Sequence, residues 1–336
     1  MLLVDSIYVN MGGGLSLLKY LVATLQEKGV KFRLLVDVRV GEQFSDVDDK
    51  VILPPSESSR YKFYTKFPQD VTSVFCFGNV PPPVKLSVPV YTYFHNINML
   101  TLADCKGWKQ LLKFWLKRLY IKCLRRNTDM WFVQTDNTAN ELIKNLRVDK
   151  AKVELYPFYK IPPIKNNECE RVDYVFIGED TGSKGHKELI LAWELLHEHG
   201  FNRTLHLTVS ARSTLYKEIE VMKNKGIDIK NHGLIPISEV FLLYSKSIAT
   251  IYPSRNESLG LGLIEAMEMG CDVIAPCLPY VYAVCQPSAT FQYGNPESIV
   301  RAILKYERGQ TKTQKLVSNT INKLIERLIT FQTIYR

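Results

Sequence analysis

The chain has 336 residues, of which 46% are hydrophobic and 23% are charged, and its formal net charge is +9. This length and composition can bury a sizeable core and suggest two domains. Seven cysteines without a C-x-x-C pair or zinc spacing argue against a disulfide framework. No apolar run approaches the roughly 20 residues of a spanning helix, and the N-terminus resembles a first strand more than a signal peptide. We therefore expect a cytosolic protein that is soluble or peripheral to a membrane.

The basic excess belongs to the first half of the chain. Residues 1–160 hold 23 Lys and Arg against 15 Asp and Glu, whereas residues 161–336 hold 20 against 19. Basic surfaces commonly meet nucleic acid or anionic membranes. Because no nucleic-acid motif with interleaved aromatic residues or zinc spacing occurs, the expected partner is an anionic membrane surface and not nucleic acid.

Residues 2–9 are predicted to form a buried strand, and an amphipathic helix is predicted over residues 15–28. Between them stand Gly12, Gly13 and Gly14. A glycine-rich turn between a strand and a helix lets backbone N–H groups approach an anion. The segment matches neither a Walker loop nor the dinucleotide-binding spacing, so its residues alone fit an anion site and an ordinary tight turn about equally.

Further strands are predicted at residues 32–38, 71–77 and 88–94, and their alternation with helices indicates a parallel sheet. His95 follows the last of these strands, at the carboxyl edge where ligands of such sheets collect. A single histidine in this position is more often structural than functional, so the pattern alone leaves both roles open.

Residues 106–126 hold eight Lys and Arg and no acidic residue. At about 100° per residue, the lysines gather on one helix face, and tryptophans and leucines fill the opposite face. This pattern is typical of a helix at a membrane interface, although a domain helix whose apolar side packs on the sheet is an alternative of nearly equal weight. Both can hold if one part of the apolar face is buried. The membrane-facing candidates are Lys106, Trp108, Lys109, Lys113, Trp115 and Lys117.

The proline-containing segment at residues 158–170 lacks periodicity and is predicted to be an interdomain linker. It separates a first domain, residues 1–157, from a second domain, residues 171–312. A terminal amphipathic helix is predicted within residues 313–336.

Residues 252–275 are the most informative stretch of the chain. Glu257 and Glu265 lie eight residues apart and bracket a Leu-Gly-Leu-Gly segment, in an order of strand, glycine-bearing turn, helix and next strand. The turn suits a phosphate, because a helix begins there. Carboxylates beside it suggest bound hydroxyl groups, as acidic residues bind ribose diols in dinucleotide folds. A nucleotide sugar offers both groups.

This stretch resembles the E-x7-E signature of retaining GT-B glycosyltransferases of family 4, of the kind that build bacterial surface polysaccharides. The resemblance implies an α/β protein of two Rossmann-like parallel-sheet domains that face each other across a cleft, with the last helix crossing back to the first domain. The matching positions are Pro253, Ser254, Glu257, Gly260, Leu261, Glu265, Ala266, Met267 and Gly270.

The resemblance also implies roles for individual residues. Glu257, His95 and Lys184 are expected to be catalytic: Glu257 at the sugar hydroxyls, His95 at the sugar or the acceptor, and Lys184 at the donor diphosphate. Glu265 is expected to bind the ribose. The predicted donor-binding residues are Gly12, Gly13, Gly14, Lys184, Gly233, Leu234, Ser258, Leu259, Gly260, Leu261 and Glu265.

The chain departs from the family pattern after the strand that precedes Lys184. Glu179 and Asp180 stand in the region where relatives commonly have an arginine. The leaving diphosphate then depends more on Lys184, or Arg212 or Arg255 assists it. No D-x-D motif accompanies these residues, so no metal site and no cofactor is expected.

The expected reaction is transfer, with retention, of a hexose-type sugar from a nucleotide sugar to a hydroxyl of an undecaprenyl-diphosphate-linked glycan. UDP-sugar is the first choice of donor, and O-antigen or capsule biosynthesis at the cytoplasmic face of the plasma membrane is the expected setting. Two other classes stay open: a GT-B isomerase of the nucleotide-sugar 2-epimerase kind, and a non-catalytic scaffold that binds sugar nucleotides.

Overall fold

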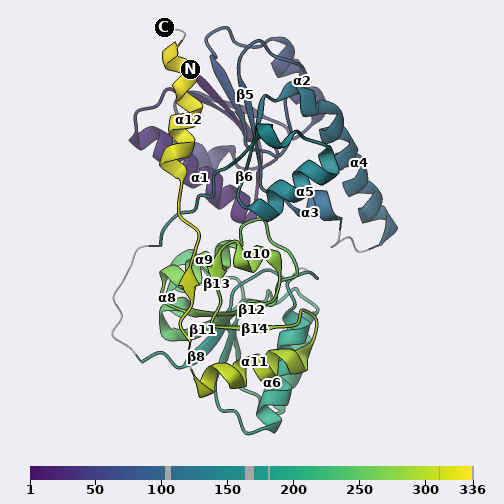
Figure 1. Cartoon of the computed structure of the whole chain (residues 1–336), viewed down its shortest axis with the longest axis vertical. Coiled ribbons are helices and arrows are strands. Elements are labelled where there is room, and N and C mark those ends of the chain that lie inside the picture. The colour runs from purple at the N-terminus through teal and green to yellow at the C-terminus, as the bar shows by residue number, and fades with distance from the viewer. Residues whose placement is uncertain (103–106, 163–169, 181, 310, 335–336) are drawn as a thin grey trace. The chain divides into compact units, whose positions relative to one another are not determined.

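The computed structural model describes residues 1–102, 107–162, 170–180, 182–309 and 311–334, and the chain divides into two units (Figure 1). The first unit comprises Met1–Lys160 together with Ser318–Arg336, and the second comprises Ile161–Val317. The division falls inside the segment predicted to be the linker, of which residues 163–169 lie outside the described part.

The first unit is built on a seven-stranded sheet in the order β3-β2-β1-β4-β5-β6-β7, with every pair parallel. The predicted parallel sheet is therefore confirmed. Its strands are β1 (Leu2–Asp5), β2 (Phe32–Asp37), β3 (Lys50–Leu53), β4 (Ser73–Cys76), β5 (Val90–Phe94), β6 (Met130–Val133) and β7 (Val153–Leu155). Its helices are α1 (Gly12–Glu27), α2 (Glu57–Thr65), α3 (Asn98–Thr101), α4 (Trp108–Leu124), α5 (Asp136–Leu146) and α12 (Ile321–Ile334).

Burial explains which strands the sequence pattern predicts. All residues of β1, β4 and β5 are buried, as expected for central strands of a sheet covered on both faces. The edge strand β3 is only partly buried and was not predicted. The start of α1 also differs from the prediction, because the helix already includes Gly12, Gly13 and Gly14.

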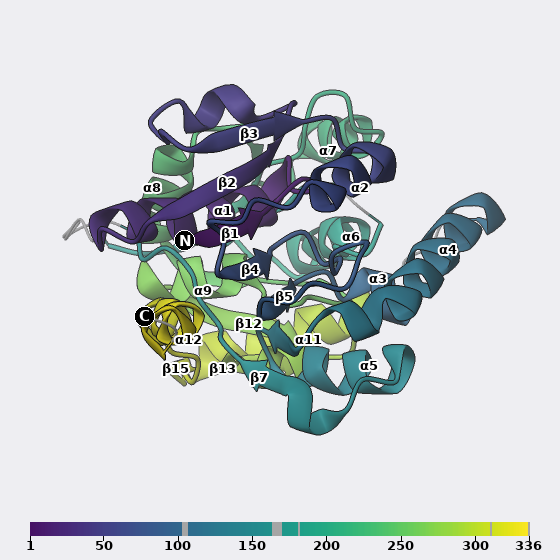
Figure 2. The ribbon, with the colours of Figure 1, turned by 90° about the horizontal axis from the view of Figure 1, so that it is seen from above.

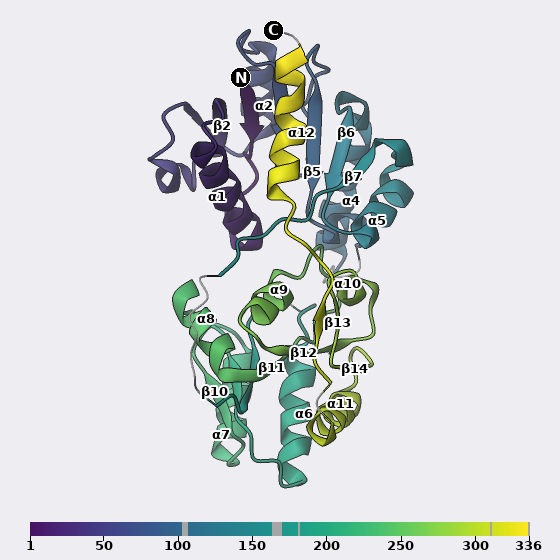
Figure 3. The same cartoon turned by 60° about the vertical axis from the view of Figure 1, so that its left-hand side comes forward.

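The C-terminal helix α12 lies against the sheet of the first unit, between α1 and β5 in Figure 3. It buries Leu324, Ile325 and Leu328, and the Thr320 amide just before it donates to the Pro157 carbonyl at 2.8 Å. The predicted start of this helix near residue 313 is wrong. Gln314–Lys315 (β15) instead pairs antiparallel with Cys285–Gln286 (β13) in the second unit.

The second unit is built on a six-stranded parallel sheet in the order β10-β9-β8-β11-β12-β14. Its strands are β8 (Asp173–Phe176), β9 (Leu205–Leu207), β10 (Ile229–Asn231), β11 (Ser247–Ile251), β12 (Asp272–Pro276) and β14 (Ala289–Phe291). Its helices are α6 (His186–Glu198), α7 (Leu215–Asn224), α8 (Ile237–Lys246), α9 (Leu261–Glu268), α10 (Pro279–Tyr282) and α11 (Pro296–Arg308).

Helix α4 differs from the other long helices because it extends away from the strands of its unit (Figure 2). Ile121 is its one buried residue, and Trp108 is 70% exposed. The alternative in which its apolar side packs on the sheet holds for the end of the helix only, where Ile121 joins the core cluster of Phe94 and Trp131. Its exposed apolar residues are Trp108, Leu111, Leu112, Trp115, Leu116 and Leu119. Within the described ranges, no helix is both long and apolar enough to cross a bilayer.

Candidate functional site

The second unit places its predicted site residues where the strand order reverses. Strand β8 is followed in the chain by β9 and β10 on one side, and β11 lies on its other side. In open parallel sheets such a switch point leaves a crevice at the carboxyl ends of the two central strands. Lys184 follows β8, and Glu257 follows β11.

Three donors converge on one oxygen of Glu257. Its Oε1 accepts from the Ser254 hydroxyl at 2.7 Å and from the Tyr252 hydroxyl at 3.0 Å, and it pairs with the Lys184 ammonium. Lys184 also lies 5.6 Å from the centre of the Tyr252 ring. The Lys184 and Glu257 side chains are only 22% and 16% exposed. The structure thus brings the two predicted catalytic residues together, in a setting where water screens their charges weakly.

Glycines allow the two loops to meet. Gly185 has a φ of +65°, and a Cβ at this position would lie 2.3 Å from the Pro253 carbonyl oxygen. The Arg255 amide donates to the Ser183 carbonyl at 2.7 Å. The loop that carries Lys184 is therefore held against the turn that carries Glu257. No other residue type fits at position 185 without moving this contact.

The turn ends at the start of α9, where Gly260 adopts a φ of +72°. No side chain caps this helix and its first turn holds no acidic residue, so its first N–H groups are available to an anion. Glu265 lies further along the helix, and burial raises its pKa to about 7. Ser258 is half-buried and Leu259 is buried, so the Leu259 side chain is not a ligand contact in this structure.

Other predicted donor residues lie further along the same sheet. Gly233 and Leu234 follow β10, the edge strand, which β9 and β8 separate from β11. Leu234 is 77% exposed. Of the arginines proposed to assist Lys184, Arg212 is exposed, and the Arg255 guanidinium lies 6.0 Å from the centre of the Tyr293 ring. Their role at a diphosphate stays a prediction.

The first unit has a cavity of about 770 Å³ at the carboxyl edge of its sheet. Its walls come from the chain after β1, β4 and β5, from the starts of α1 and α2, and from α4. The predicted residues His95 and Gly14 line it, and a Cβ added to Gly14 would lie 3.4 Å from His95 Nε2. Gly12 and Gly13 are exposed on α1. Lys113 and Lys117 line the same cavity, and Lys106 lies outside the described residues.

The hydrogen bonds of Asn79 define the tautomer of His95. Asn79 Oδ1 accepts from the His95 backbone N–H at 2.7 Å, so Asn79 Nδ2 is the group that faces His95 Nε2 at 3.2 Å. An amide NH₂ only donates, so Nε2 accepts and the ring proton lies on Nδ1. Burial lowers the pKa of His95 to about 4, so the ring is neutral at pH 7. Its buried Nδ1 has no hydrogen-bond partner among the described residues.

Asn79 adopts a φ of 67°, a conformation that is uncommon outside glycine. A buried arginine holds this loop in place. Arg60 of α2 donates to the Val80 carbonyl at 2.8 Å and to the Pro81 carbonyl at 2.7 Å, and it pairs with Asp5 of β1 at 2.8 Å. Because the buried charge has all these partners, the network fixes the loop after β4 to the end of β1.

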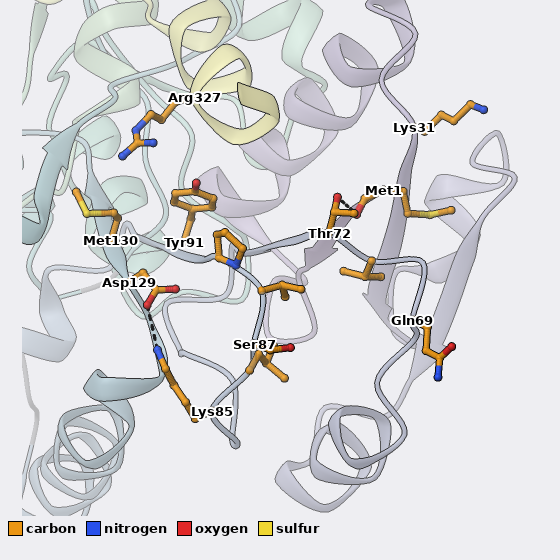
Figure 4. Close-up of a pocket in the computed structure, with 14 residues that line it drawn as sticks. Met1, Lys31, Gln69, Thr72, Lys85, Ser87, Tyr91, Asp129, Met130 and Arg327 are labelled. Carbon is orange, nitrogen blue, oxygen red and sulfur yellow. Dashed lines mark hydrogen bonds and ion pairs between the residues drawn. The ribbon is translucent and has the colours of Figure 1, made fainter. Parts of the chain in front are cut away.

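A second cavity of the first unit, of about 1020 Å³, lies at the amino ends of its strands (Figure 4). Three of its charged side chains are paired, whereas Lys31 forms no ion pair among the described residues. Lys85 lies 3.0 Å from Asp129, which also accepts from the Val90 amide at 2.9 Å. Arg327 of α12 pairs with Glu154 at 3.0 Å, and its guanidinium lies 5.6 Å from the centre of the Tyr91 ring.

Several residues at these sites were not predicted from the sequence. Ser254 stands three residues before Glu257, a turn spacing that could have suggested its hydrogen bond. Tyr252 ends the predicted strand, and its contact with Glu257 follows from that position. Asn79 had no signal beyond its place after a strand. Among the described residues, no three histidine, cysteine or acidic side chains gather as a metal site requires.

Residues 160–323 match the family Glycosyl transferases group 1. The chain is 28% identical over 134 residues to the serotype-specific mannosyltransferase WbdA of Escherichia coli, a match that covers 39% of this chain and 16% of that protein. The chain thus matches only about a sixth of the length of this relative.

Solved structures with low sequence identity share the fold over nearly the whole chain. The lipopolysaccharide outer core galactosyltransferase WaaB is 12% identical, with a TM-score of 0.66 and coverage of 99% of this chain and 97% of that chain. Sucrose-phosphate synthase from Thermosynechococcus elongatus is 14% identical, with a TM-score of 0.70 and coverage of 100% and 98%. These structures show the GT-B fold, and together with the family match they confirm the predicted resemblance to GT-B glycosyltransferases.

Proposed function

We propose that this chain is a retaining glycosyltransferase that moves a hexose-type sugar from a nucleotide sugar to a hydroxyl of a lipid-linked glycan. The observation that carries the proposal is the Lys184–Glu257 pair beside the open start of α9, inside the region that matches the family. This arrangement offers a cation and helix N–H groups to a diphosphate, and a carboxylate to sugar hydroxyls.

The reaction breaks the bond between the anomeric carbon and the diphosphate oxygen, so negative charge develops on that oxygen. The Lys184 ammonium and the first N–H groups of α9 stabilise this charge. An ammonium has three protons and can contact Glu257 and a phosphate together. All described contacts of the Glu257 side chain use Oε1, which leaves Oε2 to accept a hydrogen bond from a sugar hydroxyl.

Retention follows if the acceptor hydroxyl attacks from the face that the diphosphate leaves. The new bond joins the acceptor oxygen to the anomeric carbon, and the hydroxyl proton passes to the departing diphosphate oxygen. The protein then contributes orientation and electrostatic stabilisation, without a side chain as nucleophile, metal ion or cofactor. His95, which lines the cavity of the first unit, contacts the sugar or orients the acceptor. Glu265 binds the ribose hydroxyls.

The proposed acceptor is an undecaprenyl-diphosphate-linked glycan of O-antigen or capsule synthesis, used at the cytoplasmic face of the plasma membrane. Support comes from α4, whose exposed leucines and tryptophans lie beside a run of lysines. Such a helix inserts its apolar face at a membrane interface while lysines attract anionic headgroups. The relatives WbdA and WaaB are named for mannosyl and galactosyl transfer, and WaaB for lipopolysaccharide.

A donor screen followed by a transfer assay tests the proposal. Thermal unfolding is measured with UDP-, GDP- and dTDP-sugars, because a bound donor stabilises the folded chain. UDP-sugars are the first choice, and the stabilising donor is then incubated, labelled, with bacterial membrane lipid extract. We expect label in the lipid fraction. An epimer or free sugar from donor alone would favour an isomerase. Nucleotide binding that Glu265→Ala abolishes, with no turnover by the parent chain, would favour a scaffold.

A further inference from the structure

Two lysines of α4 face a cavity rather than only the outer surface of the helix. Lys113 and Lys117 line the carboxyl-edge cavity of the first unit, together with His95. Neither lysine forms an ion pair within the part of the chain that the structure describes. Burial, and then the charge of Lys113, lowers the pKa of Lys117. Two like charges one helical turn apart repel each other, and a bound anion would relieve the repulsion.

The remaining charged groups of this cavity leave an excess of positive charge. Arg39 lines it and pairs with Asp37 at 2.9 Å through its Nε. Glu57 is the acidic side chain of the lining, and both of its oxygens are engaged. Oε1 accepts from the Tyr8 hydroxyl, and Oε2 accepts from the Tyr120 hydroxyl at 2.5 Å. The carboxylate is therefore held by tyrosines rather than by the lysines.

The start of α1 adds to the positive electrostatic potential of this cavity. Asn10, Met11 and Gly14 line the cavity, no side chain caps the helix, and its first turn holds no acidic residue. The positive end of the helix dipole and its first N–H groups therefore lie beside the cavity. Cations and uncapped N–H groups together are the chemistry that recognises phosphate.

We propose that Lys113, Lys117 and Arg39 form a subsite that binds the phosphate or diphosphate group of the lipid-linked acceptor. The inference rests on the proposed function and adds the part of the acceptor that the first unit recognises. The two sides of α4 favour a lipid-linked acceptor as the ligand. About 160° around the helix from Lys117 lies exposed Leu119, so one helix offers cations to the cavity and an apolar surface away from it. A lipid-linked phosphate has both an anionic group and an apolar chain.

Isothermal titration of the full chain with farnesyl diphosphate, inorganic pyrophosphate and farnesol tests the subsite. The double variant Lys113→Gln/Lys117→Gln should bind both diphosphates at least tenfold more weakly than the parent chain. The matched control is Lys62→Gln on α2 combined with Lys66→Gln directly after it, which removes the same charge at the same sequence spacing from exposed positions outside the cavity lining. The control should change diphosphate affinity less than twofold, and farnesol should bind no variant more tightly than farnesyl diphosphate.

Repeating the titrations in a Lys184→Gln background separates this subsite from the donor site. Diphosphate binding that persists there and still depends on Lys113 and Lys117 supports the proposal, even if no nucleotide sugar is turned over. Equal weakening in both double variants would overturn it, because the effect would then be general charge attraction. Binding to phosphatidylglycerol vesicles that needs Lys113 and Lys117, without affinity for either diphosphate, would also overturn it and assign the lysines to phospholipid headgroups.

Discussion

The two cavities of the first unit lie at opposite edges of one sheet and differ in how their charges are satisfied. The amino-edge cavity is larger, about 1020 Å³ against about 770 Å³, yet Lys85 and Arg327 are both paired there. The carboxyl-edge cavity holds Lys113 and Lys117 without a described ion pair and His95 with an unpartnered buried nitrogen. The functional edge is therefore marked by two neighbouring lysines without a described ion pair beside a buried neutral histidine, and not by volume.

The topology explains the difference. In both units the loops after the central strands diverge at the switch point, so polar side chains can project into open space at the carboxyl edge. At the amino edge of the first unit, Arg327 of α12 instead bonds to Glu154 of β7. The Arg327–Glu154 pair thus helps to hold α12 on the first unit. The charged groups at the carboxyl edges are instead available to a ligand.

The largest effect is expected from Lys184→Gln in the second unit. Removing a cation that stabilises the leaving diphosphate should lower kcat for sugar transfer about 10²- to 10³-fold. Lys85→Gln at the amino edge of the first unit removes an equal charge and should change kcat less than twofold. Steady-state transfer assays measure kcat for both variants. Equal losses of kcat would show that a charge at the amino edge matters as much for transfer as a charge at a carboxyl edge.

Asn79→Ala is expected to lower transfer about tenfold, by loosening His95 rather than by removing a group that touches substrate. Without the Asn79 amide, Nε2 of His95 loses its donor, and the two ring tautomers should become mixed. Imidazole ¹⁵N shifts report this directly, with His186 as an internal control, since its Nε2 contacts the Gly178 carbonyl at 3.1 Å. An unchanged His95 tautomer would show that Asn79 does not position the ring.

Glu265 is expected to make stability depend on pH. Burial raises its folded-state pKa to about 7 from the ordinary 4.5, so the folded chain keeps a proton that the unfolded chain releases first. Its effect on stability is therefore absent below about pH 4.5, and destabilisation grows as pH rises toward 7. Glu265→Gln should increase the free energy of unfolding at pH 8 by about 2–3 kcal/mol, with little change at pH 4.5. Denaturant titrations at both pH values measure it, and equal effects would contradict the assignment.

Arg327→Gln should have the smallest effect. The Arg327 and Glu154 side chains are 28% and 30% exposed, so their ion pair contributes about 1 kcal/mol or less. We expect a small decrease in the free energy of unfolding and unchanged transfer kinetics. A tenfold loss of activity without unfolding would mean that the amino-edge cavity takes part in function.

Capping residues mark the starts of some helices in the sequence. Helix α5 begins after Thr135, whose hydroxyl accepts from the Thr138 amide at 3.2 Å, and α11 begins at Pro296 after the Asn295 cap. The start of α1 was predicted too late, because glycines at positions 12–14 indicate a turn although the chain is already helical there. The pairing of β15 with β13 joins segments about 30 residues apart and has no local signal.

The candidate site was predicted from the resemblance more than from local pattern. Lys184 and Glu257 are 73 residues apart, and nothing in either segment alone indicates that they pair. Helical periodicity placed Lys113 and Lys117 on one face, but it could not show that this face lines a cavity beside His95. That orientation depends on how α4 packs at Ile121 and on the neighbouring loops. The predicted domain boundaries and site roles stay predictions.

The most direct test is a double-mutant cycle on Lys184 and Glu257, with kcat and KM measured for the nucleotide sugar that stabilises the chain most. If the two residues act as one donor-binding unit, Lys184→Gln/Glu257→Gln loses about as much activity as the more damaging single variant. Losses that multiply in the double variant would show that they act independently. Parent-level activity in either single variant would contradict a joint role of Lys184 and Glu257 at the donor.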